Sequence, residues 1–156
     1  MAMDTVKKTV EYARSLEKEH DKVFRFTITT NGMLLSDENI DYINREMSNV
    51  VLSLDGRKDV NDHMRPTAGG KGSYDVIVPK FQKLVAGRGT KDYYARDTFT
   101  RENLDFAQDV MHLASLGFRH VSVEPASGPL DDPFAIKEED LDQVDAEYEK
   151  LARELM

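Results

Sequence analysis

The sequence contains no cysteine among its 156 residues. This absence excludes disulfide bonds, thiolate zinc sites, cysteine-bound iron–sulfur clusters and cysteine nucleophiles within the chain. The few histidines stand at no spacing typical of paired metal ligands: His20, His63, His112 and His120. We therefore predict that this chain binds no metal.

Long apolar runs and an excess of basic residues are also missing. No stretch approaches the roughly eighteen apolar residues needed to cross a bilayer, and the N-terminal segment is a charged pattern unlike a signal peptide. Acidic residues outnumber basic ones by 29 to 21, and the net charge of −8 opposes binding to nucleic acid. The sequence therefore predicts a cytoplasmic chain with neither a membrane nor a nucleic-acid partner.

The length of 156 residues fits one domain with a sizeable core, so we assign residues 1–156 to a single domain. Runs rich in apolar, β-branched and aromatic residues predict strands at residues 23–30, 50–54, 93–99 and 118–123. Apolar residues at helical spacing predict helices at about residues 4–19, 36–47, 73–86, 100–116 and 138–155. This alternation predicts an α/β fold, a four-stranded parallel sheet with flanking helices in the style of a partial (β/α) barrel.

Polar residues gather where each predicted strand ends. The four segments are Thr29-Thr30-Asn31-Gly32, Ser53-Leu54-Asp55-Gly56, residues 95–100 and residues 121–125. Ligands of parallel α/β proteins bind outside these strand ends, so the segments are candidate site residues. Ser53 and Asp55 are one residue apart on an extended chain, and side chains so placed could hold a diol. The alternative is that they cap the next helix or close a turn.

Two long connections are predicted as irregular loops. Residues 56–72 are the most basic stretch, and Arg65 with backbone amides could hold an anionic group there, although solvated surface loops have the same composition. Residues 124–137 contain three of the five prolines. Asn103 and His112, on the predicted fourth helix, are expected at the surface rather than in a site. The apolar stripe of the last helix predicts either core or a partner surface.

Five ordered motifs carry a resemblance that covers nearly the whole chain. They are Thr30-Asn31-Gly32, then Leu52-Ser53-Leu54-Asp55-Gly56-Arg57-Lys58, then His63-Met64-Arg65-Pro66 with Gly70-Lys71-Gly72-Ser73-Tyr74-Asp75, then residues 96–106, and finally Val121-Ser122-Val123-Glu124-Pro125. With these motifs in this order, the chain resembles radical S-adenosylmethionine (SAM) enzymes, specifically SPASM-type peptide maturases that form thioether cross-links in cysteine-rich precursor peptides.

The resemblance implies a fold, a reaction and two cofactors. The fold is a six-stranded (β/α)6 TIM-like partial barrel, of which this chain would hold the last four strands. In the parent enzyme, a [4Fe–4S] cluster and SAM generate a 5′-deoxyadenosyl radical that modifies a ribosomal peptide. The family binds its cluster through a CxxxCxxC loop and meets the SAM amino group through a glycine-glycine-glutamate stretch, both absent here. We therefore expect an inactive internal fragment with no bound cofactor.

The resemblance also assigns roles to single residues. Ser53 and Asp55 would lie beside the ribose or the methionyl group of SAM, and Arg96 and Thr98 would lie near its other end. The same barrel mouth would be lined by Asn31, and by Glu124, which would face the peptide substrate as Arg65 does. Asp97 stands where the family pattern has glycine.

Two other functions fit the sequence without radical chemistry. One is a free-standing α/β module that holds a small polar ligand through Ser53, Asp55 and Arg65, and the other is a purely structural half-barrel. A sheet that ends at the strand of residues 23–30 would also leave unpaired backbone groups along that strand. We therefore expect the chain to form a homodimer through this exposed sheet edge.

Overall fold

The computed structural model describes residues 2–129 and 131–156. Its four strands form one sheet whose spatial order follows the chain, with every neighbouring pair parallel. The strands are β1 (Thr27–Thr30), β2 (Asn49–Ser53), β3 (Asp92–Phe99) and β4 (Val121–Pro125). The predicted α/β fold with a four-stranded parallel sheet is therefore confirmed.

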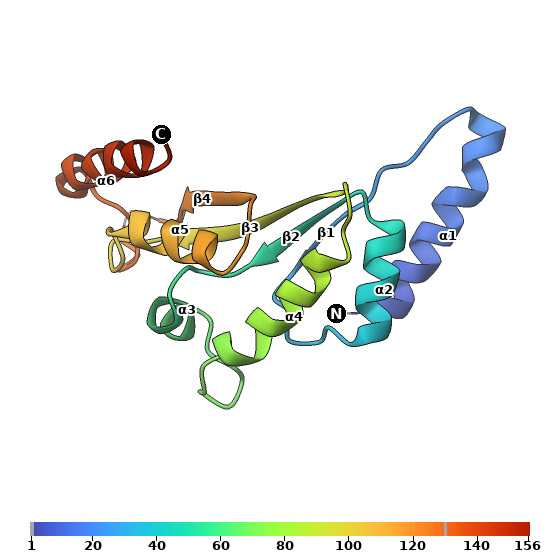
Figure 1. Ribbon diagram of the computed structural model, residues 1–156, viewed down its shortest axis with the longest axis horizontal. Coiled ribbons are helices and arrows are strands. Elements are labelled where there is room, and N and C mark those ends of the chain that lie inside the picture. The colour runs from blue at the N-terminus through green and yellow to red at the C-terminus, as the bar shows by residue number, and fades with distance from the viewer. Residues whose placement is uncertain (1, 130) are drawn as a thin grey trace.

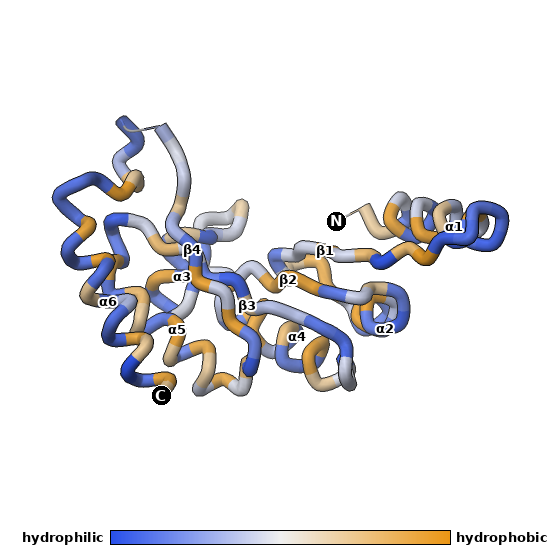
Figure 2. Tube along the Cα trace, turned by 90° about the horizontal axis from the view of Figure 1, so that it is seen from above, coloured by the Kyte–Doolittle hydropathy of each residue, from blue (hydrophilic) through white to orange (hydrophobic). Residues whose placement is uncertain are grey.

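Helices connect the strands and extend beyond both ends of the sheet (Figure 1). They are α1 (Met3–His20), α2 (Asp37–Glu46), α3 (Lys58–Met64), α4 (Tyr74–Ala86), α5 (Phe106–Ser115), the 3-10 turn η1 (Glu138–Asp140) and α6 (Leu141–Glu154). The long helices α1 and α6 lie at opposite ends of the molecule, whereas α2, α4 and α5 run along the sheet between them (Figures 1 and 2). No helix in the described part of the chain is long and apolar enough to cross a membrane.

The main core lies between the sheet and helices α1, α2 and α4. The stripes predicted from helical spacing point into it, and its fully buried members include Ile43, Phe81, Leu84, Val50 and Leu52. Helix α2 begins where its cap was expected, because the Ser36 hydroxyl accepts a hydrogen bond from the Asn39 amide at 3.3 Å. A smaller core joins β3 and α5 to α6 through Phe99 and Phe106, whose stacked rings are 4.1 Å apart.

The two faces of the sheet differ in their cover. Alternate residues of a strand point to opposite faces, and one set, including Val50, Leu52 and Ala95, is buried in the core beneath the helices. The other set includes Thr27, Thr29 and Tyr94, of which Tyr94 is 42% exposed. The second face is therefore partly open to solvent.

Four predicted boundaries were wrong. The fourth strand spans Val121–Pro125 instead of residues 118–123, and the other three differences involve contacts that local hydrophobicity does not reveal. Residues 23–25 lie outside the sheet, since the Phe24 backbone bonds to α1 instead, donating to Glu17 at 2.8 Å and accepting from Arg14 at 3.1 Å. The Phe26 carbonyl, just before β1, accepts from the amide of Asn49 in β2 at 3.2 Å. The loop predicted at residues 56–72 contains the short, largely polar helix α3. The fourth helix begins at Phe106 rather than Thr100.

A turn precedes helix α5, and it places Asn103 differently from the prediction. Its side-chain oxygen accepts hydrogen bonds from the Thr100 amide at 2.8 Å and the Thr100 hydroxyl at 3.1 Å. The Thr100 hydroxyl in turn accepts from the Glu102 amide at 3.1 Å. These bonds close a tight turn in place of a first helical turn. Asn103 is therefore buried, and its expected place at the surface was wrong.

Candidate functional site

The strand register places the predicted site residues on adjacent strands. They lie at the edge of the sheet formed by the carboxyl ends of the strands, here called the strand-end edge. Ser53 of β2 is the partner of Arg96 on β3, and Thr98 of β3 is the partner of Glu124 on β4. Partners in a parallel sheet direct their side chains to the same face. Asn31 directly follows β1, so all four strands contribute to the same edge.

Arg96 and Glu124 interact directly with each other. The Nε atom of Arg96 lies 3.3 Å from Oε1 of Glu124, and the same carboxylate oxygen accepts a hydrogen bond from Ser122 at 2.8 Å. Both charged side chains remain substantially exposed. Ser53 is half-buried beside Arg96. This row therefore offers a hydroxyl, a guanidinium and a carboxylate that solvent and small ligands can reach.

Asp55 is buried and fully engaged, being only 2% exposed. Arg65 approaches it with two nitrogens, Nε at 2.6 Å from Oδ2 and Nη2 at 2.9 Å from Oδ1. The Thr98 amide donates to the same Oδ1 at 3.1 Å. The carboxylate expected to hold a diol and the guanidinium expected to hold an anion thus bind each other in this structure. Asp55 offers little surface to a ligand, whereas the Arg65 side chain is 32% exposed.

A cavity of about 220 Å³ lies beside this ion pair and brings Asn31 and Arg65 together. Its lining residues are Asn31, Met33, Arg65, Pro66, Thr67 and Ser73. The Asn31 side-chain oxygen accepts from the Met33 amide at 3.3 Å and so shapes the turn after β1. Lys80 of α4 donates to the Met33 carbonyl at 2.8 Å. The cavity is therefore lined by polar and apolar side chains together and adjoins the strand ends.

Asn61 of α3 holds the following loop against the strand ends, a role that the sequence analysis did not identify. It is fully buried, and its side-chain oxygen accepts from the Asp55 amide at 3.3 Å. Its nitrogen donates to the Ser73 hydroxyl at 3.1 Å, and that hydroxyl donates to the Arg65 carbonyl at 2.7 Å. An asparagine six residues after Asp55 in a polar stretch carries no sequence signal that separates it from a surface residue.

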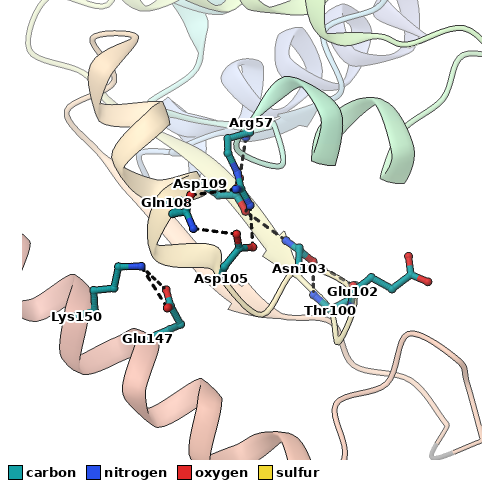
Figure 3. A network of polar contacts seen from close by, with 9 residues as sticks. All are labelled: Arg57, Thr100, Glu102, Asn103, Asp105, Gln108, Asp109, Glu147 and Lys150. Atoms are coloured by element: carbon teal, nitrogen blue, oxygen red, sulfur yellow. Dashed lines mark hydrogen bonds and ion pairs between the residues drawn. The ribbon is translucent and has the colours of Figure 1, made fainter.

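A second network missed by the sequence analysis lies on the α5 side of the site (Figure 3). The Nε atom and the amide of Arg57 contact Asp109 Oδ1 at 2.7 and 2.9 Å, and Nη2 reaches Asp105 at 2.7 Å. The hydrogen bonds that Arg57 donates to Asp109, and then those that it donates to Asp105, raise the pKa of Arg57. The available signal was the spacing of the two acids, four residues apart on one helix face. This network fixes the start of α3 to α5.

Asp97 differs from the other buried acids because neither carboxylate oxygen has a hydrogen-bond partner within the described residues. The side chain has no exposed surface. Burial is the main cause that raises the pKa of Asp97 to about 8, the charges of Asp109 and Asp55 raise it further, and Arg65 and Arg57 oppose them. Asp97 is therefore largely a neutral carboxylic acid at pH 7.

The donor set does not fit an iron–sulfur cluster, because the chain has no thiolate to bind iron. Across residues 2–129 and 131–156, no group of three or more histidine and acidic side chains is placed to hold a metal ion. The site is instead an array of hydroxyl, amide, guanidinium and carboxylate groups. Such groups suit a small polar ligand bound through hydrogen bonds.

Solved structures with a similar fold were found, although no protein-family model and no curated protein matches the sequence. Native anSMEcpe with bound AdoMet has a TM-score of 0.78 and 13% identity, over 96% of this chain and 42% of that chain. Native anSMEcpe with bound AdoMet and Kp18Cys peptide gives 0.74 and 14%, over 94% and 44%. A domain of pyruvate-formate lyase-activating enzyme from Bacteroides vulgatus ATCC 8482 gives 0.58 and 14%, over 94% and 86%.

These similarities show a shared fold. They extend over nearly all of this chain, which nevertheless spans less than half the length of the two anSMEcpe chains. The match covers 94–96% of this chain and therefore takes in its four-stranded parallel sheet. At these levels of identity, the function of the present chain has to be argued from its own residues.

Proposed function

We propose that this chain is part of a radical SAM enzyme related to SPASM-type peptide maturases, and that its strand-end edge forms part of the SAM site. The observation that carries the proposal is the agreement between two independent lines. Five motifs resemble that family in order, and the fold matches a protein solved with AdoMet over 96% of this chain. The strand register then places the motif residues on one edge.

The arrangement supports a division of roles along that edge. Ser53 offers a reachable hydroxyl to the ribose or methionyl group. Asp55 acts indirectly, because its carboxylate holds Arg65. Arg96 and Thr98 contact the other end of SAM, with Asn31 lining the mouth on the β1 side. Arg65 and Glu124 are the charged groups available to a peptide substrate, because both side chains are partly exposed.

The chain alone is proposed to be inactive and to bind SAM weakly. The cluster that would cleave SAM has no ligands here, and the glycine-glycine-glutamate stretch that would hold the SAM amino group is absent. The parent enzyme would use the 5′-deoxyadenosyl radical to cross-link a ribosomal peptide, with the cluster and the remaining SAM contacts supplied by residues outside this chain. The protein part described here would position SAM and exclude water.

A titration of the isotope-labelled chain with SAM, followed by NMR, tests the binding site. We expect millimolar-range affinity with amide shifts concentrated at Asn31, Ser53, Thr98 and Glu124. Ser53→Ala should weaken binding about fivefold, the effect of losing one hydrogen bond of about 1 kcal/mol. Ser115→Ala, which removes an exposed hydroxyl at the end of α5, is the matched control and should leave affinity unchanged.

Two results would count against the proposal. Shifts that avoid the strand ends, or equal affinities for Ser53→Ala and the unaltered chain, would remove the assigned site. Sequencing the gene on both sides of this segment tests the parent enzyme separately, since we expect a CxxxCxxC motif upstream in the same reading frame. A complete gene without that motif would favour a free-standing binding module or a structural half-barrel.

A further inference from the structure

Asn31 and Gly32 form the only asparagine–glycine pair in the sequence. The other asparagines precede residues that carry a side chain, namely Ile40, Arg45, Val50, Asp62 and Leu104. A side chain on the following residue hinders the approach of its backbone nitrogen to the asparagine carboxamide, whereas glycine leaves that approach open. Asparagine is also among the thermally labile residues of proteins. Asn31 is therefore the asparagine of this chain most prone to react with its own backbone.

The structure leaves the Asn31 side chain accessible and requires glycine after it. Asn31 directly follows β1 and is exposed, outside any helix or strand. Gly32 has a φ angle of +76°, in the left-handed region, and an added Cβ atom would lie 2.8 Å from the ring of Phe81. The reactive pair is therefore a consequence of how this turn packs against α4.

The reaction expected of such a pair is deamidation. The backbone nitrogen of Gly32 attacks Cγ of Asn31, and the new C–N bond closes a succinimide ring. The bond from Cγ to Nδ2 breaks, and ammonia leaves with the proton of the Gly32 amide. Water then opens the ring at Cγ to give aspartate, or at the main-chain carbonyl carbon to give isoaspartate. The overall change takes up water and releases ammonia, with no oxidation or reduction.

Hydrogen bonds in the folded turn hold both reacting groups. The Gly32 amide donates to the Thr30 hydroxyl at 3.1 Å, and this bond is buried. The Asn31 side-chain oxygen accepts from the Met33 amide at 3.3 Å. Lys80 of α4 donates to the Met33 carbonyl at 2.8 Å and so holds the next residue of the turn. Because ring closure removes the Gly32 amide proton, it has to break the hydrogen bond to Thr30. The fold should therefore slow the reaction.

We propose that Asn31 is a deamidation site at the strand-end edge, and that the Thr30 hydroxyl slows its reaction in the folded chain. The inference goes beyond the proposed function, because it concerns covalent chemistry of the chain itself. Asn31 lines the cavity of about 220 Å³ together with Arg65. Aspartate at this position would add a negative charge to the cavity wall, and isoaspartate would lengthen the main chain next to Gly32. Either product would change the candidate site.

Peptide mapping by mass spectrometry tests both parts of the proposal. The unaltered chain is incubated at mildly alkaline pH, both folded and in urea, and deamidation is measured as the mass gain when an amide becomes an acid. We expect Asn31 to react ahead of every other asparagine, and more slowly in the folded chain than in urea. Thr30→Val should speed the reaction of the folded chain about fivefold, the effect of losing one hydrogen bond, and should leave the rate in urea unchanged.

Two control variants separate the hydroxyl of Thr30 from other effects of substitution. Thr30→Ser keeps a hydroxyl at the same position and should react at the rate of the unaltered chain. Thr29→Val removes the exposed hydroxyl of the preceding residue on β1 and should also leave the rate unchanged. Circular dichroism checks that each variant is folded under the conditions of the incubation.

Different results would overturn the site and the restraint. Absence of a mass gain at Asn31, or faster deamidation of another asparagine, would overturn the site. Equal rates for folded Thr30→Val and the folded unaltered chain would overturn the role of the hydroxyl. If Thr30→Val does not fold, the unaltered chain still tests the restraint, because equal rates with and without urea would contradict it. None of these results depends on whether SAM binds.

Discussion

Gly56 shows how a single residue allows the strand end to meet helix α5. Its φ angle is +62°, in the left-handed region that glycine adopts readily, and an added Cβ would lie 2.1 Å from the Cβ of Asp109. This close approach lets the Arg57 amide donate to Asp109 at 2.9 Å. The left-handed backbone conformation and the lack of space for a Cβ atom therefore both require glycine at position 56.

We expect Gly56→Ala to destabilise the chain by about 3 kcal/mol or more, because overpacking adds to the left-handed backbone penalty. Gly70→Ala is the matched control. Gly70 also has a positive φ angle, +72°, but nothing lies within 4 Å of its added Cβ. The control should lose only about 1–2 kcal/mol. Urea unfolding followed by circular dichroism measures both losses, and equal losses would contradict the steric argument.

At the residue scale, the sequence predicted which strand ends meet better than it predicted the contacts between their side chains. The positions of Ser53, Asp55, Arg96 and Thr98 after or within predicted strands indicated one edge, and the register confirms that Ser53 and Arg96 are neighbours. The ion pair between Asp55 and Arg65 could not be predicted, because it depends on how α3 folds between them. Likewise, no local pattern indicates that Asp97 would be left without a partner.

At the element scale, helices with a strong hydrophobic periodicity were predicted, and the helix without one was not. The stripes of α2 and α4 are buried as expected, since Ile43, Phe81 and Leu84 all pack in the main core. Helix α3 was missed because it is stabilised by polar contacts, chiefly those of Asn61, instead of an apolar stripe. The shortening of β1 arises from side chains of α1 that bind the Phe24 backbone. Tertiary contacts of this kind are invisible to a local pattern.

Arg88 joins three elements at the edge of the sheet opposite the site. It is buried, and its Nη2 donates to the backbone carbonyls of Met47, Ser48 and Asp92 at 3.2, 3.0 and 2.6 Å. These carbonyls belong to the end of α2, the residue before β2 and the start of β3. A single side chain thus provides a hydrogen-bond donor to backbone carbonyls of three elements.

We expect Arg88→Met to lower the free energy of unfolding by about 3 kcal/mol, since it leaves several buried or partly buried carbonyls without a donor while keeping an apolar side chain of similar length. Lys91→Met is the control, because Lys91 is exposed although it also donates to two carbonyls, those of Asn44 and Arg45. The control should lose less than about 1 kcal/mol. Chemical denaturation measures the free energy of unfolding of both variants. A loss for Lys91→Met as large as that for Arg88→Met would contradict the expectation that burial of the arginine makes its hydrogen bonds more important for stability.

At the scale of the whole molecule, the sheet has an edge strand, β1, and a partly open face. Apolar side chains are exposed just before that edge, with Val23 83% and Phe24 39% exposed. An apolar cavity of about 220 Å³ lies between α1 and β1 and includes Val6, Val10 and Ile28 among its lining residues. Free strand edges with nearby apolar surface are templates for pairing with another chain.

The last prediction follows from this edge: the chain should form a homodimer through β1. A twofold arrangement is expected, because closed symmetric dimers are the commonest oligomers and an edge strand can pair with its own copy. Burial of some hundreds of Å² at about 25 cal/mol per Å² would supply several kcal/mol before the costs of association. Sedimentation at tens of micromolar should therefore give twice the monomer mass of 17.8 kDa.

Thr29→Lys, which places a charge on exposed β1, should favour the monomer, whereas Thr90→Lys, at an exposed turn, should not. A monodisperse species of 17.8 kDa for the unaltered chain would reject the dimer and would indicate that α1 already covers the exposed surface.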